Sequence, residues 1–270
     1  GAKSKRTIIK SFASQWIGSW LAGLGRVASL PKSPLLPPEH KPSGAMLLSS
    51  MLSIQRPKTK AERAARLQQI LAVLDTVYPN VTCALRHTSP WELLVATILS
   101  AQCTDERVNM VTPGLFEKYP TMQDFAAANA EEMGKAVYST GFYNNKAKNI
   151  IGAAKRILTD FGGQVPCTIE ELLTVPGAAR KTANVVLGTC FGVASGVVVD
   201  THVSRLSQRL DLTKKTDPVN IEKDLVKQLP QDRWILFSHQ LIHHGRGHCK
   251  ARNPNCRECP MNSLCYAKDK

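Results

Sequence analysis

The stretch 174-TVPGAARKTANVVLGTCFG-192 predicts a tight turn that leads into a helix. A short helix is expected just before this stretch. The first helix is expected over 168–173, the turn over Pro176–Ala179 and the second helix from Arg180. Gly177 permits both the conformation of such a turn and the close approach of another backbone. Successive N–H groups at the start of the second helix would form an anion site suited to a phosphate. The alternative is a plain connection between two helices.

Two charged residues near this turn could carry chemistry. Lys181 lies in the first turn of the second helix, where the helix dipole and the neighbouring Arg180 disfavour a protonated amine. A neutral lysine amine is a nucleophile. Asp200 follows the apolar run Val197–Val199 and precedes the helical pattern THVSRLSQRL (201–210). From position alone, Lys181 could equally bind a phosphate and Asp200 could be an ordinary helix N-cap.

The rest of the chain is predicted to be helical. Residues 59–79 repeat apolar side chains on one helical face, and 89-SPWELLVATILSAQ-102 begins with Ser89 and Glu92 at capping-box spacing. The interior of this second segment is apolar on all sides, which predicts a core helix. Only Val197–Val199 resembles a strand, so we predict an all-α protein. Further helices are expected over 104–118, 121–128, 130–138, 144–160, 168–173, 180–190, 201–210, 218–227 and 231–244.

Four cysteines gather in 249-CKARNPNCRECPMNSLC-265, with six, two and five residues between them. A disulfide framework is disfavoured, because a chain of 270 residues can bury a core without such crosslinks. The spacing alone favours zinc and an iron-sulfur cluster equally. Nearby basic residues would offset thiolate charge: Arg246, Lys250, Arg252, Arg257 and Lys268. The isolated cysteines are predicted to be buried: Cys83, Cys103, Cys167 and Cys190.

The net charge of +14 and the pI near 9.6 point to a polyanionic partner. No apolar run is long enough to span a bilayer, which predicts a soluble protein with no membrane partner. Residues 1–60 contain ten Lys or Arg and one acid. We therefore expect residues 1–57 to be a flexible, basic, proline-containing extension: a nucleic-acid-binding arm, a targeting peptide or a tail without a role.

In combination, these motifs resemble the endonuclease III family of helix-hairpin-helix DNA glycosylases. The resemblance covers about residues 60–270 and rests on 89–105, GFYNNKAKNI (141–150), the hairpin with its lysine, VDTH (199–202) and the cysteine spacing. It implies a 4Fe-4S cluster rather than zinc, held by Cys249, Cys256, Cys259 and Cys265.

The family resemblance also implies an architecture of two helical lobes with a DNA cleft between them. Residues 83–193 would form a six-helix lobe that ends in the hairpin, and residues 58–82 with 194–270 would form the cluster lobe. Lys181 and Asp200 would then come from opposite lobes and meet in the cleft.

The implied activity is that of a bifunctional DNA glycosylase and AP lyase in base excision repair. By resemblance, Lys181 attacks the sugar of an oxidised pyrimidine nucleotide in duplex DNA, Asp200 assists, and the abasic site is cleaved by β-elimination. An adenine-mismatch glycosylase is disfavoured, because its family normally lacks the lysine and carries a long C-terminal domain. A non-enzymatic iron-sulfur module for DNA binding or redox sensing is the other alternative.

Further positions match DNA contacts of the family. Gln102 and Phe142 would fill the gap left by an extruded base, although each could instead be a core or helix-end residue. His202 would contact the lesion pocket or pack at the start of its helix. The hairpin contacts would come from Gly177, Ala179 and Arg180.

Ala179 departs from the family, whose hairpin usually has a second glycine there, so strain or weaker DNA binding is expected. Roles beside the cluster or facing DNA are expected for His239, His243, His244 and His248 rather than a second metal site. The expected partner is damaged double-stranded DNA bound by a monomer. The expected compartment is the bacterial cytoplasm, with import into an organelle through the N-terminal segment as the alternative.

Overall fold

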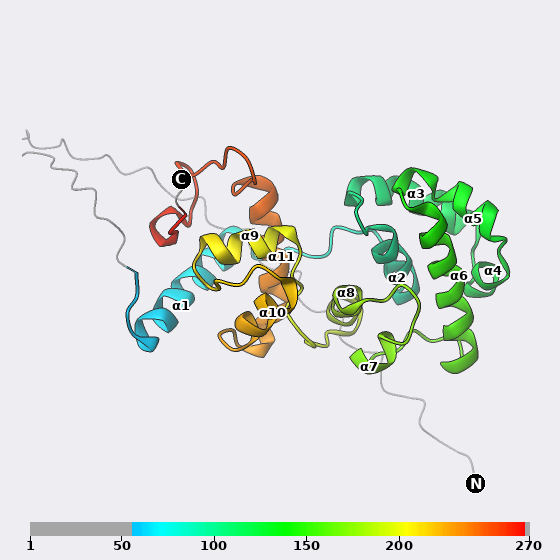
Figure 1. Ribbon diagram of the computed structural model, residues 1–270, viewed down its shortest axis with the longest axis horizontal. Helices are drawn as coiled ribbons and strands as arrows, with labels where there is room; N and C mark the ends of the chain where they lie inside the picture. The colour runs from blue at the N-terminus through cyan, green and yellow to red at the C-terminus, as the bar shows by residue number, and fades with distance from the viewer. Residues whose placement is uncertain (1–55, 268–270) are drawn as a thin grey trace, which may run out of the picture. The chain divides into compact units, whose positions relative to one another are not determined.

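The computed structural model describes residues 56–267, and all regular secondary structure in that range is helical (Figure 1). The all-α prediction is therefore confirmed, whereas the predicted extension lies, except for its last two residues, outside the described range. No described helix is both long and apolar enough to cross a membrane. The α-helices are α1 (Lys60–Val77), α2 (Pro90–Leu99), α3 (Asp105–Lys118), α4 (Met122–Ala127), α5 (Ala130–Ala136), α6 (Tyr143–Asp160), α7 (Ile169–Leu172), α8 (Arg180–Phe191), α9 (Thr201–Arg209), α10 (Pro218–Val226) and α11 (Trp234–Gly247). Three 3-10 helices, η1 (Tyr138–Thr140), η2 (Gln231–Arg233) and η3 (Asn262–Leu264), complete the described set.

Most helices begin where a side-chain oxygen can accept a bond from the first turn. Such N-caps satisfy N–H groups that have no partner within the helix. The expected capping box of α2 forms only in part: Ser89 Oγ accepts from Glu92 N at 3.2 Å, but the Glu92 carboxylate accepts from Thr88 N at 2.6 Å. The capping residues are Thr59, Ser89, Thr104, Thr121, Asn129, Thr168, Asp200 and Asp217.

The first core is built around α2, whose residues Leu93–Leu99 are all buried, as its apolar composition predicts. It extends from Leu85 to Leu187 and includes apolar side chains of α3, α5, α6 and α8. Phe125 of α4 is fully buried within it, with the Trp91 ring edge-on at a centroid distance of 5.3 Å. This core supports both the hairpin and the end of α2.

The second core is separate and joins distant parts of the chain. Its members are Leu67–Leu74 of α1 and residues from Val197 to Met261, drawn from α9, α10, α11 and the C-terminal loops. In Figure 1 the blue α1 accordingly lies with the yellow and orange helices α9, α10 and α11, away from the green ones. The chain leaves the second core after α1 and returns to it after α8.

The return segment Val197–Val199 is buried but forms no strand. Val198 N donates to Ser238 Oγ of α11 at 3.0 Å, so its backbone is satisfied by a side chain instead of a neighbouring strand. The apolar run is thus a buried crossing that leads directly to Asp200.

The prediction that the isolated cysteines are buried is wrong for Cys167, which is exposed. Cys167 lies in the loop before α7, next to the exposed N-cap Thr168, and not on a helix face that packs against a core. Cys83, Cys103 and Cys190 are only half-buried, and they pack at the edge of the first core.

Candidate functional site

The hairpin turn between α7 and α8 requires glycine at Gly177 for two reasons. Its φ of +79° lies in the left-handed region, which side chains disfavour. A Cβ at Gly177 would also lie 2.9 Å from the Asn149 Cβ and 3.2 Å from the Ile98 side chain. The turn is therefore pressed against α6 and α2, which fixes the direction of α8.

Ala179 caps the start of α8 without a side-chain hydrogen bond, since alanine has no acceptor. Its φ of −67° and ψ of 166° are ordinary extended values for any residue, and the residue is exposed. The strain expected from replacing glycine is thus absent from the backbone at this position. The first-turn N–H groups of α8 have no side-chain cap and can donate hydrogen bonds to an anion.

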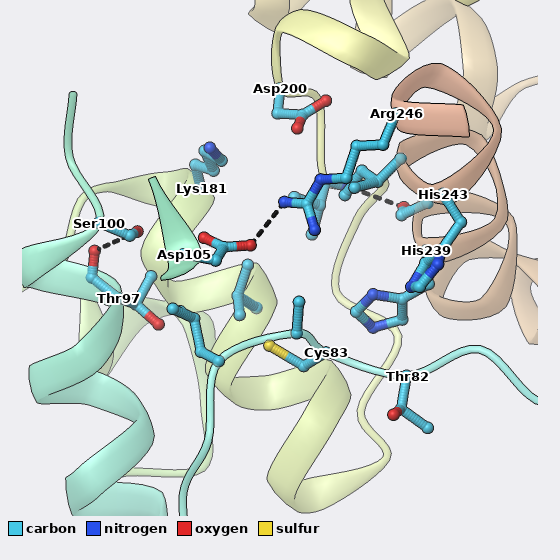
Figure 2. A pocket seen from close by; sticks show the side chains of 16 residues that line it. Thr82, Cys83, Thr97, Ser100, Asp105, Lys181, Asp200, His239, His243 and Arg246 are labelled. Atoms are coloured by element: carbon cyan, nitrogen blue, oxygen red, sulfur yellow. Dashed lines mark hydrogen bonds and ion pairs between the residues drawn. The ribbon is translucent and has the colours of Figure 1, made fainter. Parts of the chain in front are cut away.

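Lys181 and Asp200 line the same pocket, and both also line an adjoining, more open one (Figure 2). Lys181 is exposed in the first turn of α8, and Asp200 is half-buried at the start of α9. Residues common to both pockets are Ser100, Asp105, Lys181, Asp200 and Arg246. An amine and a carboxylate attached to helices of different cores therefore face one cavity.

Asp200 is also the N-cap of α9: its Oδ1 accepts from Val203 N at 2.8 Å. This bond fixes the carboxyl group, because the buried crossing before it and the helix after it are both held in place. The two interpretations of Asp200 from sequence are compatible, since capping uses Oδ1 and the residue still borders the pocket.

Asp105 and Arg246 were not singled out as site residues, yet they pair inside this pocket. Arg246 Nη2 donates to Asp105 Oδ2 at 2.5 Å, and the pair links α3 to α11 (Figure 2). Arg246 was expected to offset the charge of the cysteine site. Only the fold could reveal the pairing, because the two residues lie far apart in the sequence.

The four histidines of α11 and its C-cap divide between two faces. His239 and His243 line the pocket with Lys181, and burial, followed by the charge of His243, lowers the pKa of His239. His244 and His248 stack against each other with ring centroids 5.3 Å apart, beside the cysteines. In the described range, no group of histidines, cysteines and carboxylates is arranged to hold a single metal ion.

His202 both borders the open pocket and packs between helices. Its ring fills the space beside Gly245 of α11, where a Cβ would lie 2.7 Å from His202 Nδ1. Arg205 Nη2 lies 3.1 Å from the same Nδ1. Burial lowers the pKa of His202, so the ring is neutral near pH 7.

Gln102 and Phe142 are exposed, which excludes a core role for either. Each adopts a left-handed backbone, with φ of 54° and 47°, a conformation that costs free energy in residues other than glycine. Gln102 borders the open pocket, and Phe142 is 63% exposed at the start of α6. Aromatic side chains exposed to this extent on a basic protein suit contact with bases.

The Arg180 guanidinium bonds within the protein. Its Nε donates to Glu222 Oε2 at 3.0 Å and its Nη2 donates to Glu222 Oε1 at 3.2 Å. Asn184 Nδ2 donates to the same carboxylate at 3.2 Å. This network ties α8 to α10, and Glu222 raises the pKa of Arg180.

The four clustered cysteines line one pocket near the C-terminus: Cys249, Cys256, Cys259 and Cys265. Two of their sulfurs accept a bond from an N–H group: Arg209 Nη1 donates to Cys249 Sγ at 3.2 Å, and Ala267 N donates to Cys265 Sγ at 3.4 Å. Four thiols with adjacent N–H donors match the ligand chemistry of an iron-sulfur cluster.

His244 completes this surrounding shell. Its Nε2 lies 3.4 Å from Cys259 Sγ, and its Nδ1 lies 3.1 Å from the Tyr78 hydroxyl. Burial lowers the pKa of His244 to about 4, so the ring is neutral and has a single N–H. A Tyr78 hydroxyl that donates to Nδ1 leaves the Nε2–H group to donate to the cysteine sulfur.

Comparison with protein families gives two matches along the chain. Residues 95–231 match the HhH-GPD superfamily base excision DNA repair protein. Residues 249–265 match the iron-sulfur binding domain of endonuclease III. The first match includes the hairpin, Lys181 and Asp200, and the second includes all four clustered cysteines.

Individual relatives give the same result. Endonuclease III of Synechocystis sp. is 56% identical over 205 residues, which cover 76% of this chain and 94% of the relative. Endonuclease III of Bacillus subtilis is 47% identical over 203 residues, covering 74% and 92%. Solved structures of a non-covalent endonuclease III-DNA complex and a trapped endonuclease III-DNA covalent intermediate each match at TM-score 0.72 and 42% identity, covering 75% of this chain and 95% of theirs.

Proposed function

Because this chain belongs to the endonuclease III family of base excision DNA repair proteins, we propose that it is a bifunctional DNA glycosylase and AP lyase. The observation that carries the proposal is the shared pocket of Lys181 and Asp200, which joins a nucleophile beside the hairpin to a carboxylate fixed by α9. The substrates are damaged duplexes, and we propose oxidised pyrimidines as the lesion class.

In the first step the unprotonated Lys181 Nζ attacks C1′ of the extruded nucleotide. The glycosidic bond breaks, its electron pair leaves with the base, and the base takes up a proton. The Asp200 carboxylate stabilises the positive charge that develops on the sugar and accepts a proton from the attacking amine. Its bond from Val203 N holds it in place, so little reorganisation is needed.

In the second step the C1′–O4′ bond breaks, O4′ keeps the electron pair and takes up a proton, and Lys181 Nζ is left as a Schiff base with C1′. The iminium withdraws electrons, so a base can remove a C2′ proton, and the C3′–O bond breaks with the electron pair leaving on the 3′ phosphate. Water then hydrolyses the imine and restores the lysine. The strand is thus cleaved at the abasic site by β-elimination.

A 4Fe-4S cluster suits the four clustered cysteines, and the match of residues 249–265 to the iron-sulfur binding domain of endonuclease III agrees with their donor chemistry. When bound, such a cluster would crosslink the C-terminal loop through its cysteine ligands and supply a redox-active centre. Arg209 and His244 would donate to its cysteine ligands.

Borohydride capture on a duplex with one abasic site tests the proposal. The wild-type protein should become covalently attached to DNA, because borohydride reduces the Schiff base to a stable amine. Lys181→Gln should bind the duplex and give no capture. Lys155→Gln, which changes an exposed lysine of α6 outside the pocket, should retain capture. Binding without capture by the wild type would contradict the lyase and favour a DNA-binding module.

The same assay separates this activity from that of an adenine-mismatch glycosylase, which would release adenine from a mismatch without capture.

Monomeric binding is part of the proposal, and sedimentation of the complex with one duplex checks it. We also propose the bacterial cytoplasm as the compartment, because the relatives described above are bacterial. A fluorescent protein fused to residues 1–57 tests the alternative, since import into an organelle would contradict the cytoplasmic assignment.

A further inference from the structure

Lys146 of α6 is a buried cation, only 4% exposed, without a carboxylate among its described ion pairs or hydrogen bonds. Its Nζ donates to Leu99 O at 2.8 Å and to Thr140 O at 2.6 Å. Burying an ammonium costs free energy unless nearby dipoles replace its water. Two short bonds to carbonyls offset that cost, although burial still lowers the pKa of Lys146.

The two carbonyls occupy particular positions in the fold. Leu99 is the last residue of α2, where carbonyls lack helical partners and the helix dipole favours a cation. Thr140 is the last residue of η1. The single ammonium therefore joins the C-terminal ends of α2 and η1, although Leu99 and Thr140 are distant in the sequence.

Each of these ends leads within three residues to an exposed left-handed residue. The chain runs from Leu99 to Gln102, and from Thr140 through Gly141 to Phe142. A left-handed backbone at a residue other than glycine persists only where the surrounding structure holds it. Lys146 contacts both segments, because its ammonium bonds to Leu99 O, three residues before Gln102, and to Thr140 O, two residues before Phe142.

We propose that Lys146 is a positioning residue that fixes two loops relative to each other: the Gln102 loop (residues 100–102) and the Phe142 loop (residues 141–142). The Gln102 and Phe142 side chains would then enter the duplex together when a base is extruded. The inference rests on the proposed function. With the loops fixed in advance, insertion of the two side chains requires little further ordering. Without the clamp, each loop would move independently.

The proposal is tested by whether Gln102 and Phe142 act together. We would measure single-turnover excision of an oxidised pyrimidine for the wild type, Gln102→Ala, Phe142→Ala and the double variant, and repeat the set with Lys146→Met. When Lys146 is intact, the fold loss of excision in the double variant should be at least about tenfold smaller than the product of the two single fold losses. In the Lys146→Met background the losses should multiply to within about twofold.

A spectroscopic signal separates positioning from general damage. 2-Aminopurine placed opposite the lesion should report entry of the side chains with wild-type protein, and this fluorescence change should be lost with Lys146→Met. Cleavage of a preformed abasic site should fall less than excision, because no base has to be extruded. Lys155→Met, an exposed change on the same helix, should resemble the wild type in both assays.

The outcomes are distinguishable. If the losses of excision from Gln102→Ala and Phe142→Ala simply multiply while Lys146 is intact, the positioning role of Lys146 is wrong. That test remains valid even if Lys146→Met does not fold. An unchanged fluorescence signal and coupling in folded Lys146→Met protein would also overturn it. Absence of borohydride capture by the wild type would instead contradict the proposed function.

Discussion

The Arg246 guanidinium of α11 donates to the Asp105 carboxylate of α3 at 2.5 Å, which joins a helix of the second core to a helix of the first. Both residues line the pocket shared by Lys181 and Asp200. A second link, from Arg180 to Glu222, connects α8 to α10. Two ion pairs therefore connect helices of the two cores near Lys181 and Asp200.

Arg246→Gln should lower excision by about 10- to 100-fold, because small displacements between reacting groups are costly. The unfolding free energy should change by about 1 kcal/mol or less, since the Arg246 side chain is 37% exposed and solvent screens the pair. Single-turnover kinetics and chemical denaturation measure the two effects. Arg233→Gln is the matched control, because Arg233 pairs with Asp75 outside the pocket. Equal loss of excision in both variants would contradict this role.

Asp200→Asn should leave stability almost unchanged, because asparagine caps helices about as well as aspartate and can still accept from Val203 N. Base excision should fall by at least ~10²-fold, since the negative charge that stabilises the transition state is removed. The measurement is the rate of base excision by the wild type and by Asp200→Asn, compared in preparations with the same iron-sulfur content per chain. Near-normal excision would mean that Asp200 is only a cap, and the proposed mechanism would be wrong.

Purified protein should be brown and contain about four iron and four sulfide per chain, as expected for a 4Fe-4S cluster. Metal analysis and visible absorbance measure this directly. Cys256→Ser should reduce the iron content, whereas Cys167→Ser, at an exposed cysteine remote from the cluster segment in sequence, should not. Stoichiometric zinc in the native protein would contradict the assignment.

His239 should titrate below the ordinary histidine range, because burial lowers its pKa. The unfolded chain then binds a proton that the folded chain does not, so this contribution to stability is present above about pH 6.5 and is lost as the pH falls below it. Asp105, Arg246 and His243 border the same pocket and share its field. NMR titration, with His239→Gln to assign the signal, measures the pKa, and a value above about 6.5 would contradict the burial argument.

Deletion of residues 1–57 should leave the salt dependence of DNA binding unchanged, because basic residues remain throughout 61–270. The slope of log affinity against log salt counts the phosphates that the protein neutralises. Fluorescence anisotropy over a range of salt concentrations gives that slope. A shallower slope in the truncated protein would identify the extension as a DNA-binding arm.

The helices could be predicted because their signals are local. Ser89 and Thr168 begin helices within a few residues of the apolar positions that they precede, and Gly177 marks its turn by the absence of a side chain. Lys181 and Asp200 could be nominated because each lies at a recognisable helix start, whereas their catalytic roles came from the resemblance to the endonuclease III family. Such features need no knowledge of the rest of the fold.

The contacts that could not be predicted join residues distant in sequence. Nothing near Asp105 indicates Arg246, and the mostly polar residues around Lys146 in the sequence give no sign that its amine is buried and reaches two carbonyls. Arg180 shows the same limit, because its partner Glu222 belongs to the other core. Charged residues have several possible partners, and only packing of the cores selects among them.

The position of α1 in the second core affects how the protein can be synthesised and dissected. On the ribosome, α1 emerges before the whole first core, so its apolar face has no partner until residues from Val197 onward are made. A nascent chain that ends after α8 therefore contains a complete first core and an unpaired α1. A fragment that begins at Val197 would lack Leu67, Ile70 and Leu74, so the half that carries the cysteines cannot be produced intact as one continuous piece.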